Sequence, residues 1–137
     1  MPTKKIVFTV QNLGFTGCDD GLFALTFDLA APGGRQLGDG VSCVHVPSDC
    51  PPVAGCRGVV QATFTLAFAR GSLTAPVALH ELWLSESTIL QVTRGKITPG
   101  KGDFAGATGS IGCIGTVRFT ETDVIPKIVC VVRVARP

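Results

Sequence analysis

LQVTRGKITPGKGDFAGATGSIGCIGTV, residues 90–117, joins two short apolar strands through a segment that is dense in glycine. Glycines at 95, 100, 102, 106, 109, 112 and 115 are too frequent for a helix. They suit a sheet that bends sharply or that lets another backbone approach closely. A phosphate-binding loop is excluded, because neither a Gly-Lys-Ser/Thr sequence nor a helix start follows. We therefore interpret this stretch as a structural part of the sheet and not as a ligand-binding loop.

The rest of the chain alternates apolar and polar residues, the pattern of half-buried β-strands. No amphipathic helix of ten or more residues is evident, and the segment HELWLSE, residues 80–86, fits either a helical turn or an extended chain. Short turns rich in Gly, Pro and Asp separate the alternating segments. The expected strands are residues 5–10, 23–30, 41–46, 58–69, 72–79, 87–97, 111–120 and 127–135. This pattern predicts an all-β chain, a single domain of residues 1–137 folded as an eight-stranded antiparallel up-and-down β-barrel.

Composition limits the possible partners. Net charge is +2 and only 16% of residues are charged, with Lys and Arg scattered, so we expect no nucleic acid. No apolar run reaches the length of a membrane-spanning helix, and we expect no membrane partner. With 45% hydrophobic residues, both faces of the barrel should be partly buried, which predicts a homo-oligomer. The N-terminus lacks the apolar core of a signal peptide, which favours a cytoplasmic location and leaves a secreted mature form open.

The six cysteines, at positions 18, 43, 50, 56, 113 and 130, allow two interpretations. They form disulfides in an oxidising compartment, or they are buried free thiols that behave as small hydrophobes. Cys43 and Cys56 flank a proline-rich loop and are candidates for a disulfide across a hairpin, whereas Cys130 has the surroundings of a core residue. No CxxC motif occurs, so we expect no metal site and no cofactor.

Several segments together resemble the allene oxide cyclase-like barrels, which are relatives of plant dirigent proteins. The segments are LQVT at 90–93, GDFAGATG at 102–109, QATFTLAF at 61–68 and Gly40-x-x-Cys43-Val44. The resemblance covers roughly residues 38–135. It implies an eight-stranded barrel, commonly dimeric or trimeric, whose mostly apolar pocket holds a small reactive intermediate and guides its cyclisation.

The resemblance also implies positions for pocket residues. Thr9 and Gln11 take the places of the first-strand Glu and Asn of the family, and Cys43 takes the place of its pocket cysteine. If Thr9 and Gln11 face inward, Val60, Phe64 and Phe68 on the long strand are the expected substrate-binding walls. The other interpretation is that these apolar residues simply fill the interior of a small barrel.

Five further residues are candidates on chemical grounds. Asp28 is a catalytic carboxylate if its face is buried, and a surface residue otherwise. His45 shares a strand face with Cys43, so the two form either a proton-transfer pair or a structural cluster. The pair His80-Glu81 is expected near the barrel mouth. There it acts as an acid or base towards a substrate, or it is simply a pair of solvated polar residues on the rim. Trp83, the only tryptophan, covers a pocket or an interface.

The sequence thus favours a cofactor-independent cyclase or isomerase that acts on a small apolar intermediate of specialised metabolism. The alternatives are a non-catalytic small-molecule-binding or dirigent-like barrel, cytoplasmic or secreted, and a secreted, disulfide-stabilised structural protein with a filled barrel. A cavity that contains Asp28, His45 or Glu81 favours the enzyme. An all-apolar cavity favours the binding protein.

Overall fold

A computed structural model describes residues 3–135, which form eight β-strands. Within that range there is no helix long and apolar enough to cross a membrane. The strands are β1 (Thr3–Thr16), β2 (Phe23–Ala30), β3 (Gln36–Val46), β4 (Arg57–Phe68), β5 (Gly71–Trp83), β6 (Thr88–Gly102), β7 (Thr108–Phe119) and β8 (Val124–Ala135).

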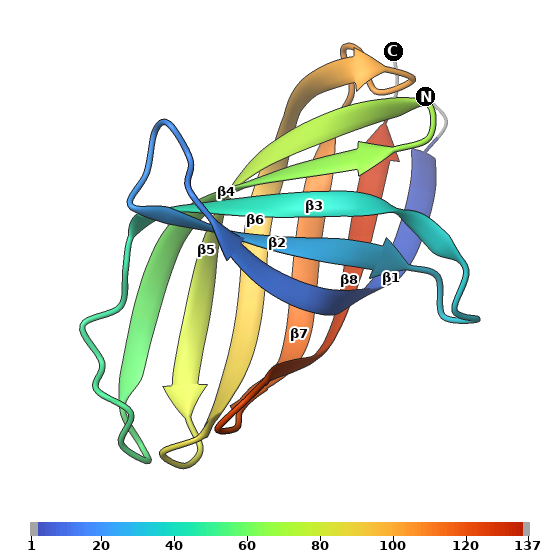
Figure 1. Cartoon of the computed structure of the whole chain (residues 1–137). Helices are drawn as coiled ribbons and strands as arrows, with labels where there is room; N and C mark the ends of the chain where they lie inside the picture. The colour runs from blue at the N-terminus through green and yellow to red at the C-terminus, as the bar shows by residue number, and fades with distance from the viewer. Residues whose placement is uncertain (1–2, 136–137) are drawn as a thin grey trace.

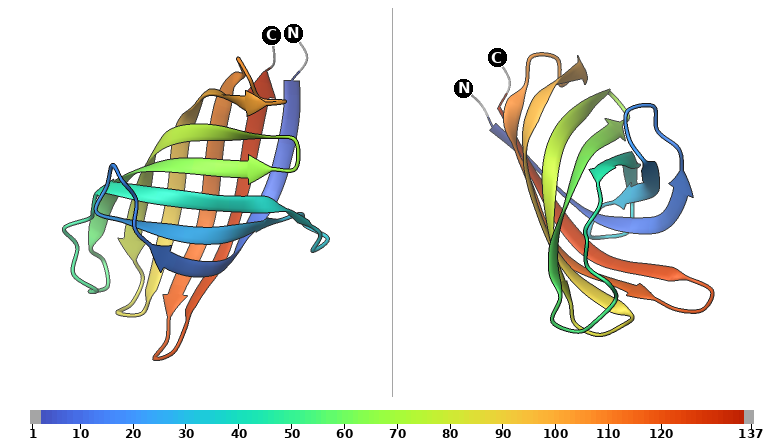
Figure 2. Two further views of the ribbon diagram at one scale, coloured as in Figure 1. Left: turned by 45° about the horizontal axis from the view of Figure 1, so that its top comes forward. Right: turned by 90° about the vertical axis from the view of Figure 1, so that its left-hand side faces the viewer.

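The strands follow one another around a closed barrel in chain order (Figure 1). Every neighbouring pair is antiparallel, and β1 closes the barrel on β8 with Phe8 opposite Cys130. Figure 2 shows the two ends of the described chain side by side at one end of the barrel. The predicted eight-stranded antiparallel up-and-down barrel is therefore confirmed.

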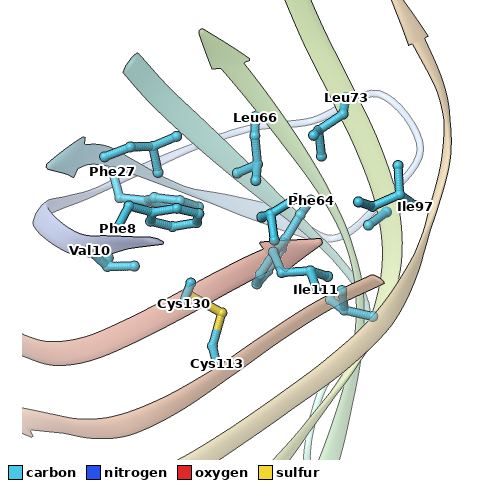
Figure 3. Close-up of a cluster of buried hydrophobic side chains, with 14 of the residues drawn as sticks. Phe8, Val10, Phe27, Phe64, Leu66, Leu73, Ile97, Ile111, Cys113 and Cys130 are labelled. Atoms are coloured by element: carbon cyan, nitrogen blue, oxygen red, sulfur yellow. A yellow bond between two sulfur atoms is a disulfide. The ribbon is translucent and has the colours of Figure 1, made fainter. Parts of the chain in front are cut away.

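One end of the barrel is filled with side chains. Leu66, Leu73 and Val132 are almost completely buried there, and the rings of Phe68 and Phe104 pack with their centroids 5.5 Å apart. Figure 3 shows Leu66 and Leu73 among the buried side chains that point into the interior. Burial of this apolar surface stabilises the barrel and closes the end at which the chain begins and finishes.

The glycine-rich stretch, residues 90–117, forms most of β6, the turn at residues 103–107 and most of β7. Gly102 and Gly109 have φ angles of 62° and 149°, which side-chain-bearing residues rarely adopt. A Cβ atom on Gly109 would also collide with the carbonyl oxygen of Arg133 on β8. A Cβ atom on Gly102 would meet the carbonyl oxygen of Arg70, so Gly102 lets β6 approach the β4–β5 turn, and Gly109 lets β7 approach β8.

The structure resolves one ambiguity of the sequence and extends several strands. The segment 80–83 is extended and completes β5, because the apolar alternation of residues 73–79 continues through Glu81 and Trp83. β1 runs on to Thr16 beyond an irregularity between Gln11 and Gly14, where Asn12 has a φ angle of 56°. Before the irregularity the even-numbered residues Phe8 and Val10 point inward, and after it the odd-numbered residues Leu13 and Phe15 do.

All six cysteines form disulfides, and the Cys43–Cys56 pairing predicted from the hairpin loop is wrong. The bonds are Cys18–Cys43, Cys50–Cys56 and Cys113–Cys130. Cys43 points outward from β3 and bonds to Cys18 of the β1–β2 loop. Cys56 instead bonds to Cys50, which lies within the same proline-rich loop. Cys130 is buried as expected but bonded, because Cys113 faces it directly across the β7–β8 pair.

Candidate functional site

The end of the barrel opposite the chain termini is hollow. A cavity of about 330 Å³ opens between the β1–β2, β3–β4, β5–β6 and β7–β8 loops, and its volume is in the range of small-molecule sites. Most of its wall is apolar and comes from alternate residues of all eight strands. The polar side chains of the wall are Ser42, Ser48, Glu81, Gln91 and Thr93.

Glu81 is the one ionisable side chain in the cavity wall. The alternation of β5 turns it inward after Val77 and Leu79. Its cross-strand neighbour on β6 is Gln91, whose Nε2 donates a hydrogen bond to Glu81 Oε2 over 2.7 Å.

The carboxyl of Glu81 is chemically perturbed by this position. Burial raises its pKa above the ordinary glutamate value of 4.5, because desolvation penalises the charged form. The hydrogen bond from Gln91 acts in the opposite direction and is the smaller effect. The bond from Gln91 engages Oε2 of the carboxyl.

Three residues expected to line a pocket do line the cavity. Val60 and Phe64 face inward from β4, and Trp83 lies near the mouth. The ring of Phe64 packs edge-on against Phe27 with a centroid separation of 6.0 Å, and Trp83 stacks on Phe119 at the same separation. Figure 3 shows Phe64 and Phe27 pointing into the barrel together with Phe8.

Two other expected wall residues lie elsewhere. Phe68 is at the filled end, against Phe104, and borders a separate surface hollow of about 460 Å³ beside Lys4 and Arg35. Cys43 faces outward and is bonded to Cys18, because the inward positions of β3 are taken by its neighbours.

Four of the predicted catalytic residues, Thr9, Gln11, Asp28 and His45, do not face the cavity. Thr9 points outward, where its hydroxyl donates to the Ala30 carbonyl over 3.4 Å, and Gln11 is exposed. Both follow from the inward orientation of Phe8 and Val10, which sends odd-numbered residues of this part of β1 outward.

Asp28 and His45 are outward for the same reason of alternation. The carboxylate of Asp28 accepts a 2.8 Å hydrogen bond from Asn12 Nδ2 across β1 and β2. His45 Nδ1 donates to the Asp20 carbonyl over 2.9 Å, while its Nε2 is 2.8 Å from the hydroxyl of Thr63. His45 therefore links the β1–β2 loop to β4 through these two contacts, which agrees with a structural role and not with a proton-transfer pair.

Ser42, Ser48, Gln91 and Thr93 are the polar wall residues that the sequence does not single out. Glu81, expected with His80 near the barrel mouth, does line the cavity, whereas His80 is exposed and does not. The signal for Glu81 was present: residues 75, 77, 79, 81 and 83 have one parity, so extending the strand through 80–83 would have placed it inward. For Ser42, which precedes Cys43, nothing in the sequence indicated a place in the cavity wall. Within residues 3–135 no cluster of His, Cys, Asp and Glu is arranged to hold a metal ion.

Charge is distributed unevenly around the cavity mouth. The four loops at this end, residues 17–22, 47–56, 84–87 and 120–123, contain six carboxylates and no Lys or Arg. Exposed apolar side chains, among them Leu22, Val53 and Leu84, lie in the same loops. The mouth is thus both apolar and negative, which disfavours the approach of anions.

The sequence matches no protein-family model, and no curated protein matches it either.

Proposed function

We propose that this barrel is a cofactor-independent isomerase or cyclase that binds a small, neutral, apolar intermediate and directs its rearrangement. One observation carries the proposal: Glu81, a carboxyl with a raised pKa, lies in the wall of an otherwise apolar cavity. Catalytic acids are characteristically tuned in this way, by burial that keeps the proton on the carboxyl.

The proposed chemistry needs only the carboxyl and the shape of the cavity. Glu81 donates its carboxyl proton to a carbonyl or epoxide oxygen of the ligand, which activates the neighbouring carbon–carbon or carbon–oxygen bond. After ring closure or movement of a double bond, the carboxylate recovers a proton from carbon, and the acid is regenerated. The apolar walls, including Phe64 and Trp83, hold one reactive conformer, and such orientation is worth up to about 7–11 kcal/mol in favourable systems.

Two features support the class of ligand. An apolar wall favours a molecule without formal charge, and the six carboxylates at the mouth repel anions. The resemblance to allene oxide cyclase-like and dirigent barrels supports a reactive intermediate that must be folded. A non-catalytic carrier is the second candidate, favoured by the apolar character of most of the wall.

The disulfides bear on where the protein works. All six cysteines are paired, and structural disulfides persist mainly in oxidising environments. We therefore favour an oxidising compartment over the cytoplasm.

We further propose that two copies pack through an outer apolar patch on β1, β6, β7 and β8. Its centre is Ile114, 60% exposed, opposite Val129, 45% exposed, and cross-strand pairs extend it on both sides. The outer apolar patch consists of Val7, Val92, Ile114, Val129 and Val131. It contains no charged side chain, and a two-fold dimer buries the same patch on both copies.

The substitution Ile114→Asp is expected to convert the dimer to a monomer, because a carboxylate in the centre of an apolar interface is left unpaired. Light scattering coupled to gel filtration measures the mass directly. Thr65→Asp, on the exposed outer face of β4, serves as the control and should remain dimeric. A monomeric wild-type protein at micromolar concentration would refute this interface.

A pH profile of turnover tests the proposed function. Wild-type protein is assayed on a panel of small unsaturated ketones and epoxides. Turnover should be highest in acid and should fall as pH rises through the pKa of Glu81, above 4.5, because only the protonated carboxyl is an acid. Absence of turnover on the whole panel would favour the carrier, and a rate that rises with pH would contradict the acid role.

A further inference from the structure

The Ser42 hydroxyl is the one buried side-chain oxygen or nitrogen in residues 3–135 that has no hydrogen-bond partner. The residue is 3% exposed and lies in the wall of the cavity. Native proteins rarely leave such a group unpaired, because burying a hydroxyl without a partner is unfavourable. The unpaired hydroxyl therefore calls for a partner from outside the chain.

The position of Ser42 follows from the alternation of β3. Cys43 and His45 face outward, so Ser42 faces inward between its cross-strand neighbours Leu25 and Phe64. Both neighbours line the cavity and are apolar, and neither offers a hydrogen bond from its side chain. Because Oγ itself is buried, its contact with a molecule in the cavity requires a change of χ1 to another staggered rotamer.

We propose that Ser42 is a specificity-determining residue whose hydroxyl donates a hydrogen bond to a carbonyl oxygen of the bound molecule. This inference rests on the proposed use of the cavity as a binding site. A neutral carbonyl fits better than an anionic acceptor, because Leu25 and Phe64 surround the hydroxyl and carboxylates surround the mouth. The ligand is then a neutral, apolar ketone or aldehyde.

This contact complements the proposed acid. Ser42 lies on β3 and Glu81 on β5, with β4 between them, so the two polar groups meet the ligand from different parts of the wall. One hydrogen bond in an apolar cavity fixes little more than a position, whereas two fix an orientation as well.

The test uses two probes of similar shape, cyclohexyl methyl ketone and isopropylcyclohexane, which differ in the carbonyl oxygen. Trp83, the only tryptophan in a chain without tyrosine, lies in the cavity wall and reports occupancy by its fluorescence. Ser42→Ala should weaken binding of the ketone by about five- to tenfold, the loss of one hydrogen bond, and leave binding of the hydrocarbon unchanged. Ser42→Thr, which keeps the hydroxyl, should retain the ketone selectivity.

Two further measurements separate this role from a structural one. Ser42→Ala should unfold at the same temperature as the wild type or higher when no ligand is present, because an unpaired buried hydroxyl has been removed. Ser48→Ala is the matched control: Ser48 also lines the cavity, but its Oγ already accepts a 3.0 Å hydrogen bond from the Cys50 backbone amide. That variant should keep the wild-type ratio of affinities for the two probes.

The outcomes are distinguishable. If Ser42→Ala changes the affinity for both probes equally, or for neither, the role of Ser42 is overturned and the proposed function stands. A marked loss of stability in ligand-free Ser42→Ala would overturn it too, since the hydroxyl would then have a partner within the fold. If the wild-type protein binds neither probe, both the binding cavity and the role of Ser42 fall.

Discussion

Replacing Glu81 with glutamine is expected to slow turnover by roughly 100- to 10,000-fold, the usual contribution of a positioned general acid. Glutamine has nearly the same shape as a protonated glutamate, and its side-chain oxygen can still accept the hydrogen bond from Gln91. It cannot give up a proton to the ligand. Affinity for an unreactive ketone, read from Trp83 fluorescence, should therefore change little while the rate falls.

The Glu81→Gln variant should also be at least as stable as the wild type at neutral pH. Burial raises the pKa of Glu81 in the folded protein, so the folded state binds the proton more tightly than the unfolded state. The resulting contribution to stability is complete below the unfolded value of about 4.5 and is lost as pH rises through the folded value. Removing the carboxyl thus removes the free-energy cost of burying a charged carboxylate at neutral pH. A loss of activity in the variant therefore cannot be explained by unfolding.

Glu86→Gln is the matched control for this substitution. Glu86 is an exposed glutamate in the β5–β6 loop, outside the cavity wall, and its replacement makes the same chemical change. Activity should be retained in this variant. Wild-type rates in Glu81→Gln, or equal losses in both variants, would remove Glu81 from the mechanism.

Replacing Cys113 and Cys130 together with alanine is expected to lower the free energy of unfolding by about 3 kcal/mol. The disulfide closes a loop with a sequence separation of 17, and the chain-entropy relation gives about that value for the unfolded state. Both residues are also buried and line the cavity, so lost packing adds to the effect. Figure 3 shows their disulfide among the buried side chains. Against a typical total of about 5–15 kcal/mol, this is a large fraction of the stability.

Chemical denaturation monitored by Trp83 fluorescence measures this loss. The Cys50–Cys56 pair is the comparison, because its sequence separation of 6 corresponds to only about 2 kcal/mol in the same relation. Thiol titration of the unfolded, unreduced wild-type protein should detect no free thiol. Six free thiols would refute the disulfides. A loss of unfolding free energy below about 1 kcal/mol in the Cys113/Cys130 variant would show that this disulfide contributes little to stability.

Much of the barrel is readable from the sequence because strand alternation is a local property. Residues 58–69 predict both the long strand and its inward face, so Val60 and Phe64 are correctly placed in the wall. The glycine-rich stretch similarly predicts a close approach of backbones, as found where a Cβ atom at Gly102 or Gly109 would meet a carbonyl oxygen.

Orientation relative to the interior was harder to predict for the catalytic candidates. The resemblance places Thr9 and Gln11 in the pocket by position alone, whereas Phe8 and Val10 have the larger apolar side chains and point into the interior. Disulfide partners depend on which strands meet in space: Cys113 and Cys130 become neighbours only through the β7–β8 register. Nothing local in the sequence distinguishes that pairing from the others.

The role of Glu81 is open to direct measurement by carbon-13 NMR titration of its side-chain carboxyl, with and without cyclohexyl methyl ketone. We expect a pKa above 4.5 in the free protein, raised further when the ketone displaces water from the cavity. A pKa at or below 4.5 that does not respond to the ketone would contradict an acid in a ligand-binding cavity.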